Sequence, residues 1–261
     1  RFIERFDGAQ SGHITVPAQV IQPCDVLNLL TLAGQRTGTQ GIIARQICMA
    51  IVDVVRFAHR SRIHVVSWDD RLVTLECSAG KRYKKKSGAR VGYQYSIPRV
   101  WSERSDLASL LLDFWGEHGT AGGLCPGLRL GKSRAVDADA VWLQKPMSYR
   151  QFSAILQGLL VATGHTALSA SAFTYNSLRR TIPTMADVCR VDDADAQAVG
   201  NWQEIVATAA KRESKASEPM CRRYSGGKVA FTGTIKGRLL AACMEHTKRL
   251  LKSRGVSPNS Q

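Results

Sequence analysis

The chain has 261 residues, 44% hydrophobic and 22% charged, so it can form one large domain or two small ones around a buried core. Its 36 lysines and arginines exceed its 21 aspartates and glutamates, which leaves a formal net charge of +15. Such an excess favours nucleic acid over an anionic membrane surface as the partner, because neutralised phosphates release counterions.

The sequence has no run of about 18 apolar residues, so it predicts no membrane-spanning helix and no membrane partner. Its seven cysteines are dispersed, without a Cys-x-x-Cys pair and without histidines at metal-binding spacing. This pattern is typical of a reducing compartment and predicts no metal site. We therefore expect an intracellular protein, in the nucleus of a eukaryote or otherwise in the cytoplasm or nucleoid.

The N-terminal quarter is predicted to be helical after an irregular start. Residues 1–23 contain two glycines and two prolines with little periodicity, which is typical of a linker or the end of an upstream domain. A helix is predicted to open at Cys24 and Asp25 and to stop at Gly34. Apolar residues at helical spacing then predict a second helix over about 39–60, with arginines on its surface.

The apolar period changes after residue 60 and predicts a small antiparallel sheet. Three short segments rich in β-branched and aromatic residues, 64–68, 72–77 and 91–97, predict a three-stranded meander that Pro98 ends. The connection between the last two strands is the very basic segment 81–86. A positively charged hairpin is therefore expected at one end of the sheet.

The C-terminal half is predicted to be helical again. Helices are expected over the segments 106–118, 148–161, 174–190, 192–199 and 228–253. A Gly-rich surface loop is expected over 119–140 and a mobile polar stretch over 203–219. The predicted fold class is α+β and mainly helical, with one domain over 24–255 and a tail over 256–261.

Three short motifs follow one another in the C-terminal half. Residues 175–181 read Tyr-Asn-Ser-Leu-Arg-Arg-Thr, 200–202 read Gly-Asn-Trp and 222–224 read Arg-Arg-Tyr. In this order they resemble the second half of the active site of tyrosine recombinases, the phage-integrase family. The 23 residues from Arg179 to Trp202 match the usual spacing of that family, and the resemblance covers about residues 25–250.

The resemblance implies a tyrosine-recombinase catalytic fold that cuts and rejoins duplex DNA through a 3′-phosphotyrosine, without a metal ion or small-molecule cofactor. It implies Tyr224 as the nucleophile and Arg179 as a catalytic arginine, with Trp202 and Asn176 beside the phosphate. A lysine of the basic hairpin would protonate the leaving oxygen, and counting along the strands leaves both Lys81 and Lys84 open.

Other basic residues are expected to bind the DNA backbone, and the expected partners are duplex DNA and further copies of the chain in a homo-oligomer on DNA. The predicted DNA-binding residues are Arg180, Lys85, Lys86, Arg222, Arg223 and Arg56.

The chain departs from the family at the first catalytic arginine. The family places that arginine three residues before an acidic residue, and Ala50 stands at this distance from Asp53. Arg56, Arg45 and Arg36 are the candidates to replace it. A second departure is the long interval of 22 residues between Trp202 and Tyr224. These departures leave a non-catalytic DNA-binding relative as the alternative function, with an unrelated basic RNA-binding protein as a third.

Overall fold

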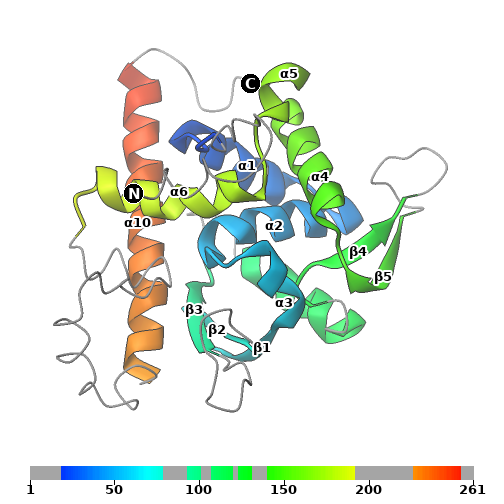
Figure 1. Cartoon of the computed structure of the whole chain (residues 1–261). Helices are drawn as coiled ribbons and strands as arrows, with labels where there is room; N and C mark the ends of the chain where they lie inside the picture. Colours follow the sequence, from blue (N-terminus) through cyan, green and yellow to red (C-terminus); the bar gives the residue numbers. More distant parts are fainter. Residues whose placement is uncertain are drawn as a thin grey trace, which may run out of the picture.

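The computed structural model describes residues 19–78, 93–100, 107–119, 123–130, 140–191 and 226–253. The described chain is an α+β fold, mainly helical, with one three-stranded antiparallel sheet and one two-stranded sheet (Figure 1). The helices are α1 (Pro23–Gln35), α2 (Gly38–Asp53), α3 (Leu107–His118), α4 (Tyr149–Ala162), α5 (Ala167–Ser171), α6 (Tyr175–Val188), α10 (Gly226–Ser253) and the 3₁₀ helix η1 (Phe57–Arg62). The strands are β1 (Ile63–Trp68), β2 (Leu72–Cys77), β3 (Tyr93–Pro98), β4 (Pro126–Arg129) and β5 (Val141–Pro146).

Helix α2 forms the centre of the molecule. Every residue from Ile43 to Asp53 is buried, and α2 contacts α1, α3, α4, α6 and β3. A helix that is buried all round belongs to the core, and its few polar side chains then need partners inside the protein. Two of these polar side chains, Gln46 in the middle of the helix and Asp53 at its end, are therefore the first place to look for a built site.

The range predicted for the second helix, 39–60, extends too far. Helix α2 ends at Asp53, because Val54 adopts a left-handed conformation with φ of 54° that cannot continue the helix. The Oδ1 atom of Asp53 accepts a hydrogen bond from the backbone N–H of Val55 at 3.2 Å and so closes the turn. The chain then resumes as η1, which leads directly into β1.

The predicted three-stranded meander is confirmed. The strand order is β1-β2-β3, and both pairs are antiparallel. In β2, Val73, Leu75 and Cys77 are buried while the residues between them are half-buried, as expected for alternating faces. The sheet therefore presents one face to the helical core.

The expected surface loop over 119–140 is wrong at residues 126–129, which form a strand. Pro126–Arg129 forms β4, which pairs antiparallel with β5. Strand β4 is hard to predict from the sequence, because it has only four residues and contains Pro126 and Gly127, which disfavour strands. The short helix α5 was likewise not predicted.

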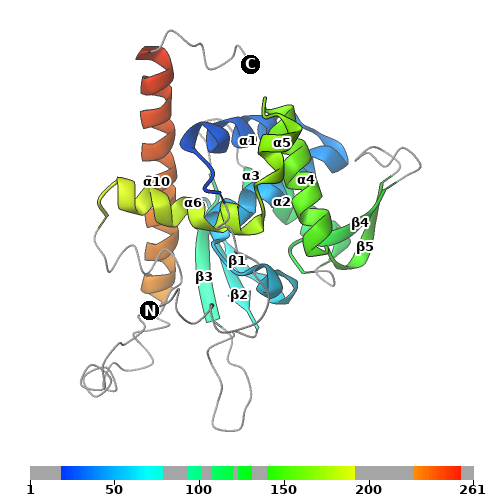
Figure 2. The same ribbon diagram turned by 45° about the horizontal axis from the view of Figure 1, so that its top comes forward.

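The C-terminal helix α10 lies along one flank of the molecule, and the β4–β5 hairpin lies on the opposite flank (Figure 1, Figure 2). Helix α10 contacts β3, β2, α1 and α6. Gly233 allows this close approach, since a Cβ there would lie 2.5 Å from Ser96 Oγ and 2.7 Å from Leu72 Cδ2. The backbone N–H of Gly233 donates to Ser96 Oγ at 3.1 Å, which fixes the helix on the sheet.

Five sequence predictions concern segments outside the described residues. They are residues 1–18 of the linker 1–23, the basic hairpin 81–86, the helix 192–199, the polar stretch 203–219 and the tail 256–261. The remaining predicted helices are confirmed, with ends that agree to within a few residues.

Candidate functional site

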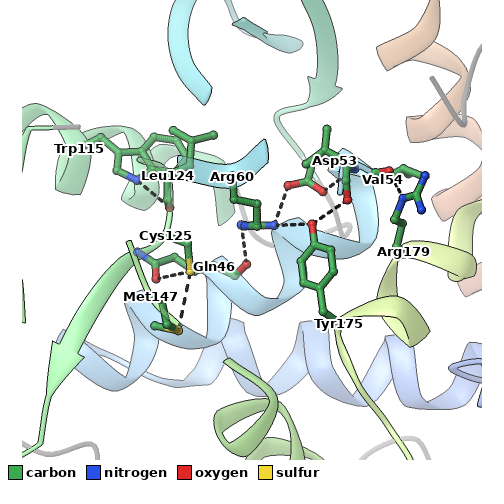
Figure 3. A network of polar contacts seen from close by, with 11 residues as sticks. Gln46, Asp53, Val54, Arg60, Trp115, Leu124, Cys125, Met147, Tyr175 and Arg179 are labelled. Atoms are coloured by element: carbon green, nitrogen blue, oxygen red, sulfur yellow. Dashed lines mark hydrogen bonds and ion pairs between the residues drawn. The ribbon is translucent and has the colours of Figure 1, made fainter. Parts of the chain in front are cut away.

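The turn after α2, residues 53–56, is held by two side chains of α6. The hydroxyl of Tyr175 donates to the carbonyl of Val55 at 2.8 Å, and Nε of Arg179 donates to the carbonyl of Val54 at 3.0 Å (Figure 3). Tyr175 is the first residue of α6, and Arg179 lies one turn further along. Both bonds satisfy backbone carbonyls that the end of a helix leaves without partners.

A buried ion pair supports the same turn from inside. Arg60 Nη1 lies 2.7 Å from Asp53 Oδ2, and the two residues are 3% and 0% exposed. The same Nη1 reaches the Tyr175 hydroxyl at 3.5 Å, while Nη2 donates to the carbonyl of Gln46 at 3.3 Å. Asp53, Arg60 and Tyr175 therefore form one network that joins α2, η1 and α6 (Figure 3).

The charges in this network depend on one another. Burial is the largest single influence on Arg60 and disfavours its charged guanidinium, but Asp53, Tyr175 and Cys125 together outweigh burial, and the pKa of Arg60 is raised. Burial likewise raises the pKa of Asp53, and Arg60 and the Val55 N–H oppose that rise. The guanidinium is therefore permanently charged and committed to Asp53 inside the protein, so it is not available to a ligand.

Arg179 differs from Arg60, because it is half-buried and only its Nε donates to a described residue. Its Nε is used by Val54, and within the described ranges its two Nη atoms form no hydrogen bond and no ion pair. Burial lowers the pKa of Arg179, and the next largest cause is repulsion from Arg56. Arg56 is also half-buried and belongs to the same turn. Two guanidinium groups thus lie near each other at the edge of the core.

Of the three candidates for the missing first arginine, only Arg56 lies on the turn that Arg179 contacts. Arg45 is buried, and its Nη1 donates to the carbonyl of Arg36 at 3.1 Å. Arg36 itself is exposed and bonded to Gln40 at 2.9 Å. The surface position predicted for all arginines of the segment 39–60 is wrong for Arg45 and Arg60.

Ala50 is fully buried, so the position does not face an open surface. The structure therefore offers no room there for the arginine that the family alignment placed at this point. An arginine at position 50 is expected to disrupt the core rather than restore a catalytic group.

The other predicted site residues divide into two groups. Asn176 is exposed and lies three residues before Arg179 on α6, which places it on the same helix surface. Arg180 is exposed at the next position, about 100° further round the helix. The remaining predicted residues, Lys81, Lys84, Lys85, Lys86, Trp202, Arg222, Arg223 and Tyr224, lie outside the described residues.

Residues next to the undescribed basic segment do lie near the arginines. Tyr93, the first residue of β3, is close enough to Arg179 to influence its pKa. Its hydroxyl lies 3.3 Å from Nδ1 of His59 on η1. The start of β3 is therefore on the same side of the molecule as the Arg56–Arg179 pair.

Lys236 is a buried charged residue that sequence reasoning missed. It is 0% exposed on α10, its Nζ lies 5.3 Å from the centre of the Tyr95 ring, and Nζ has no hydrogen-bond acceptor among the described residues. Burial lowers its pKa to about 8, and the charge of Asp53 opposes that shift. The signal in the sequence was its spacing, because Lys236 falls on the apolar stripe of α10 with Ile235, Leu239 and Leu240.

Stability is expected to rise with pH because of Lys236. The pKa of Lys236 is about 8 in the folded protein against 10.5 as its ordinary value. Between these two values the unfolded chain binds the extra proton, so the free energy of unfolding increases as pH rises. We expect a gain of about 2 kcal/mol between about pH 8 and pH 9.5, measured by urea unfolding.

The Lys236→Met variant should lose this gain and be more stable than the wild type at about pH 7. The exposed residue Arg238 on the same helix offers a matched control, since Arg238→Met should keep the wild-type pH dependence. An equal pH dependence in Lys236→Met and the wild type would contradict the assignment.

The sequence matches no protein-family model, and no curated protein matches it significantly. In the part of the chain that the structure describes, no cluster of three or more His, Cys, Asp or Glu side chains is placed to hold a metal ion. Over the same residues no helix is long and apolar enough to cross a membrane.

Proposed function

We propose that the chain is a tyrosine recombinase-like domain that binds duplex DNA and cleaves and rejoins its strands. The observation that carries this proposal is the Arg56–Arg179 pair. Two like charges at the edge of the core repel each other, and within the described ranges neither forms an ion pair. An anion that bound between them would relieve this repulsion, and a phosphodiester suits the planar donors of guanidinium groups.

The chemistry follows from this geometry together with the motif residues. Tyr224 attacks the phosphorus and holds the 3′ end of the strand as a phosphotyrosine, which conserves the energy of the broken bond. Arg179 and Arg56 stabilise the negative charge that develops on the non-bridging oxygens. Lys81 or Lys84 donates the proton to the leaving 5′-oxygen, and Asn176 and Trp202 add hydrogen bonds to the phosphate.

A covalent trap tests the catalytic part of the proposal. Nicked duplexes of random sequence would be incubated with the protein, and covalent complexes would be separated on a denaturing gel. We expect a complex with the wild type and none with Tyr224→Phe. Absence of the complex, with duplex binding retained, would instead support the non-catalytic DNA-binding relative, which the buried Ala50 favours.

DNA binding itself is expected to weaken steeply with salt. The net charge of +15 predicts several phosphate contacts, so affinity should fall by orders of magnitude between about 50 and 200 mM salt. Replacing Lys84, Lys85 and Lys86 together by alanine should reduce the slope of log affinity against log salt by about 2 to 3. Fluorescence anisotropy of a labelled duplex measures both quantities.

The exposed cations Lys145 and Arg150 provide the control, because they lie on the flank that carries β5 and the start of α4. Replacing this pair by alanine should leave the slope nearly unchanged. An unchanged slope in the triple lysine variant would mean that the basic segment does not contact DNA. A preference for RNA over duplex DNA at equal salt would favour the third alternative.

A further inference from the structure

Tyr175 is a buried tyrosine at the start of α6 that the proposed chemistry does not use. Its side chain is 0% exposed, so it cannot reach a DNA strand as a nucleophile. Burial raises the pKa of its hydroxyl group, which therefore keeps its proton and acts as a hydrogen-bond donor. A fully buried hydroxyl needs an acceptor, and the acceptor shows which part of the fold this side chain holds.

The hydroxyl and the ring of Tyr175 contact the two chain neighbours of Arg56. The hydroxyl donates to the carbonyl of Val55 at 2.8 Å, and the ring packs edge-on against Phe57 with 5.1 Å between the ring centres. Val55 directly precedes Arg56, and Phe57 directly follows it. One side chain of α6 therefore holds the backbone on both sides of Arg56.

Arg179 contacts the same turn one residue earlier. Its Nε donates to the carbonyl of Val54 at 3.0 Å, next to the carbonyl that accepts the Tyr175 hydroxyl (Figure 3). Tyr175 and Arg179 are four residues apart, and side chains at this spacing lie on one surface of a helix. Two adjacent carbonyls of the turn are thus bonded to two adjacent turns of α6. The backbone that carries Arg56 cannot shift along α6 without breaking these bonds.

We propose that Tyr175 is a positioning residue that fixes Arg56 relative to Arg179. Its hydroxyl holds the turn against α6, and its ring holds the chain where it leaves the turn at Phe57. The ring also packs against Phe152, with 5.1 Å between the ring centres, so it is itself fixed in the core. The consequence for phosphate binding rests on the proposed function, whereas the link between Tyr175 and the two arginines is a property of the fold.

Two tyrosine variants make a matched pair for the test. Tyr175→Phe removes the hydroxyl and keeps the ring, so it breaks the bond to Val55 without emptying the core. Tyr149→Phe is the control, because Tyr149 also packs against Phe57, with 5.2 Å between the ring centres. Tyr149 is 41% exposed, and its hydroxyl forms no hydrogen bond to another described residue.

The measurement observes both arginines by NMR and needs no DNA. Each Nε–H signal would be assigned through its loss in Arg56→Lys or Arg179→Lys. We expect the Arg179 Nε–H of Tyr175→Phe to exchange roughly fivefold faster than in the wild type, because the turn loses a hydrogen bond. The Nε chemical shift of Arg56 should also change, whereas a loss of global stability alone would leave this native-state signal in place. Tyr149→Phe should match the wild type in both signals.

Unchanged signals from both arginines in a folded Tyr175→Phe would overturn the inference. Phe57→Leu is the second variant, since it removes the ring contact and keeps the tyrosine hydroxyl. It should change the Arg56 signal and leave the exchange rate at Arg179 nearly unchanged. If both variants failed to fold while Tyr149→Phe folded, Tyr175 would be a fold residue and the positioning role would be wrong.

Nicked DNA separates this inference from the proposed function. Tyr175→Phe should form the covalent complex about tenfold more slowly than the wild type, because the two guanidinium groups are misplaced, and its affinity for intact duplex should stay within about twofold. A wild-type rate in Tyr175→Phe would contradict the positioning role. A wild type that binds no duplex DNA would refute the proposed function alone, because the NMR measurement does not depend on it.

Discussion

Replacing Arg179 by alanine is expected to slow covalent complex formation with nicked DNA by about 10²–10³-fold. The reason is that Arg179 offers Nη donors at the edge of the core, and a donor aimed at developing charge acts mainly in the transition state. Binding of intact duplex should weaken by no more than about tenfold, since many other cations contact the backbone. Single-turnover gel assays and anisotropy measure the two effects separately.

Arg56→Ala should have a comparable effect, because Arg56 lies on the turn that Arg179 contacts and its charge repels that of Arg179. Arg150→Ala is the control, an exposed arginine at the start of α4 that should change neither quantity. If Arg56→Ala cleaved at the wild-type rate while Arg179→Ala did not, Arg56 would not be the missing first arginine. Wild-type rates in both variants would remove the basis of the catalytic proposal.

The periodic parts of the fold could be predicted from the sequence, and the non-periodic parts could not. The meander 63–98 and the helices α1, α3, α4, α6 and α10 follow from apolar spacing and caps, which are local properties. Helix α2 was extended too far because Val54 and Val55 continue the apolar pattern, while the turn depends on Asp53 and on contacts from α6. Strand β4 depends on pairing with β5, which the sequence does not show.

The candidate site could be predicted only where a motif exists. Arg179 and Asn176 were found from the motif at 175–181, and the structure places both on one surface of α6. Arg56 was the first candidate to replace the missing arginine, and only the fold shows that it lies on the turn that Arg179 contacts. Asp53, Arg60 and Tyr175 come from α2, η1 and α6, so no local pattern in the sequence could show that their side chains meet.

Arg60 and Arg62 show that burial cannot be predicted from the local sequence. They also provide a matched pair of variants for a prediction about the free energy of unfolding. The two arginines stand two residues apart in η1, yet Arg60 is buried against Asp53 and Arg62 is exposed. Arg60→Met is expected to lower the free energy of unfolding by about 3–5 kcal/mol, because it leaves a buried carboxylate without its closest cation. Arg62→Met should change it by less than about 0.5 kcal/mol.

Urea unfolding of both variants measures the difference, and a double-mutant cycle identifies its origin. If the loss comes from the unpaired charge of Asp53, Asp53→Asn combined with Arg60→Met should cost less than the sum of the two single changes. Part of the loss should remain in the double variant, since Arg60 also donates to Tyr175 and to the Gln46 carbonyl. Equal losses for Arg60→Met and Arg62→Met would show that the pair does not stabilise the turn.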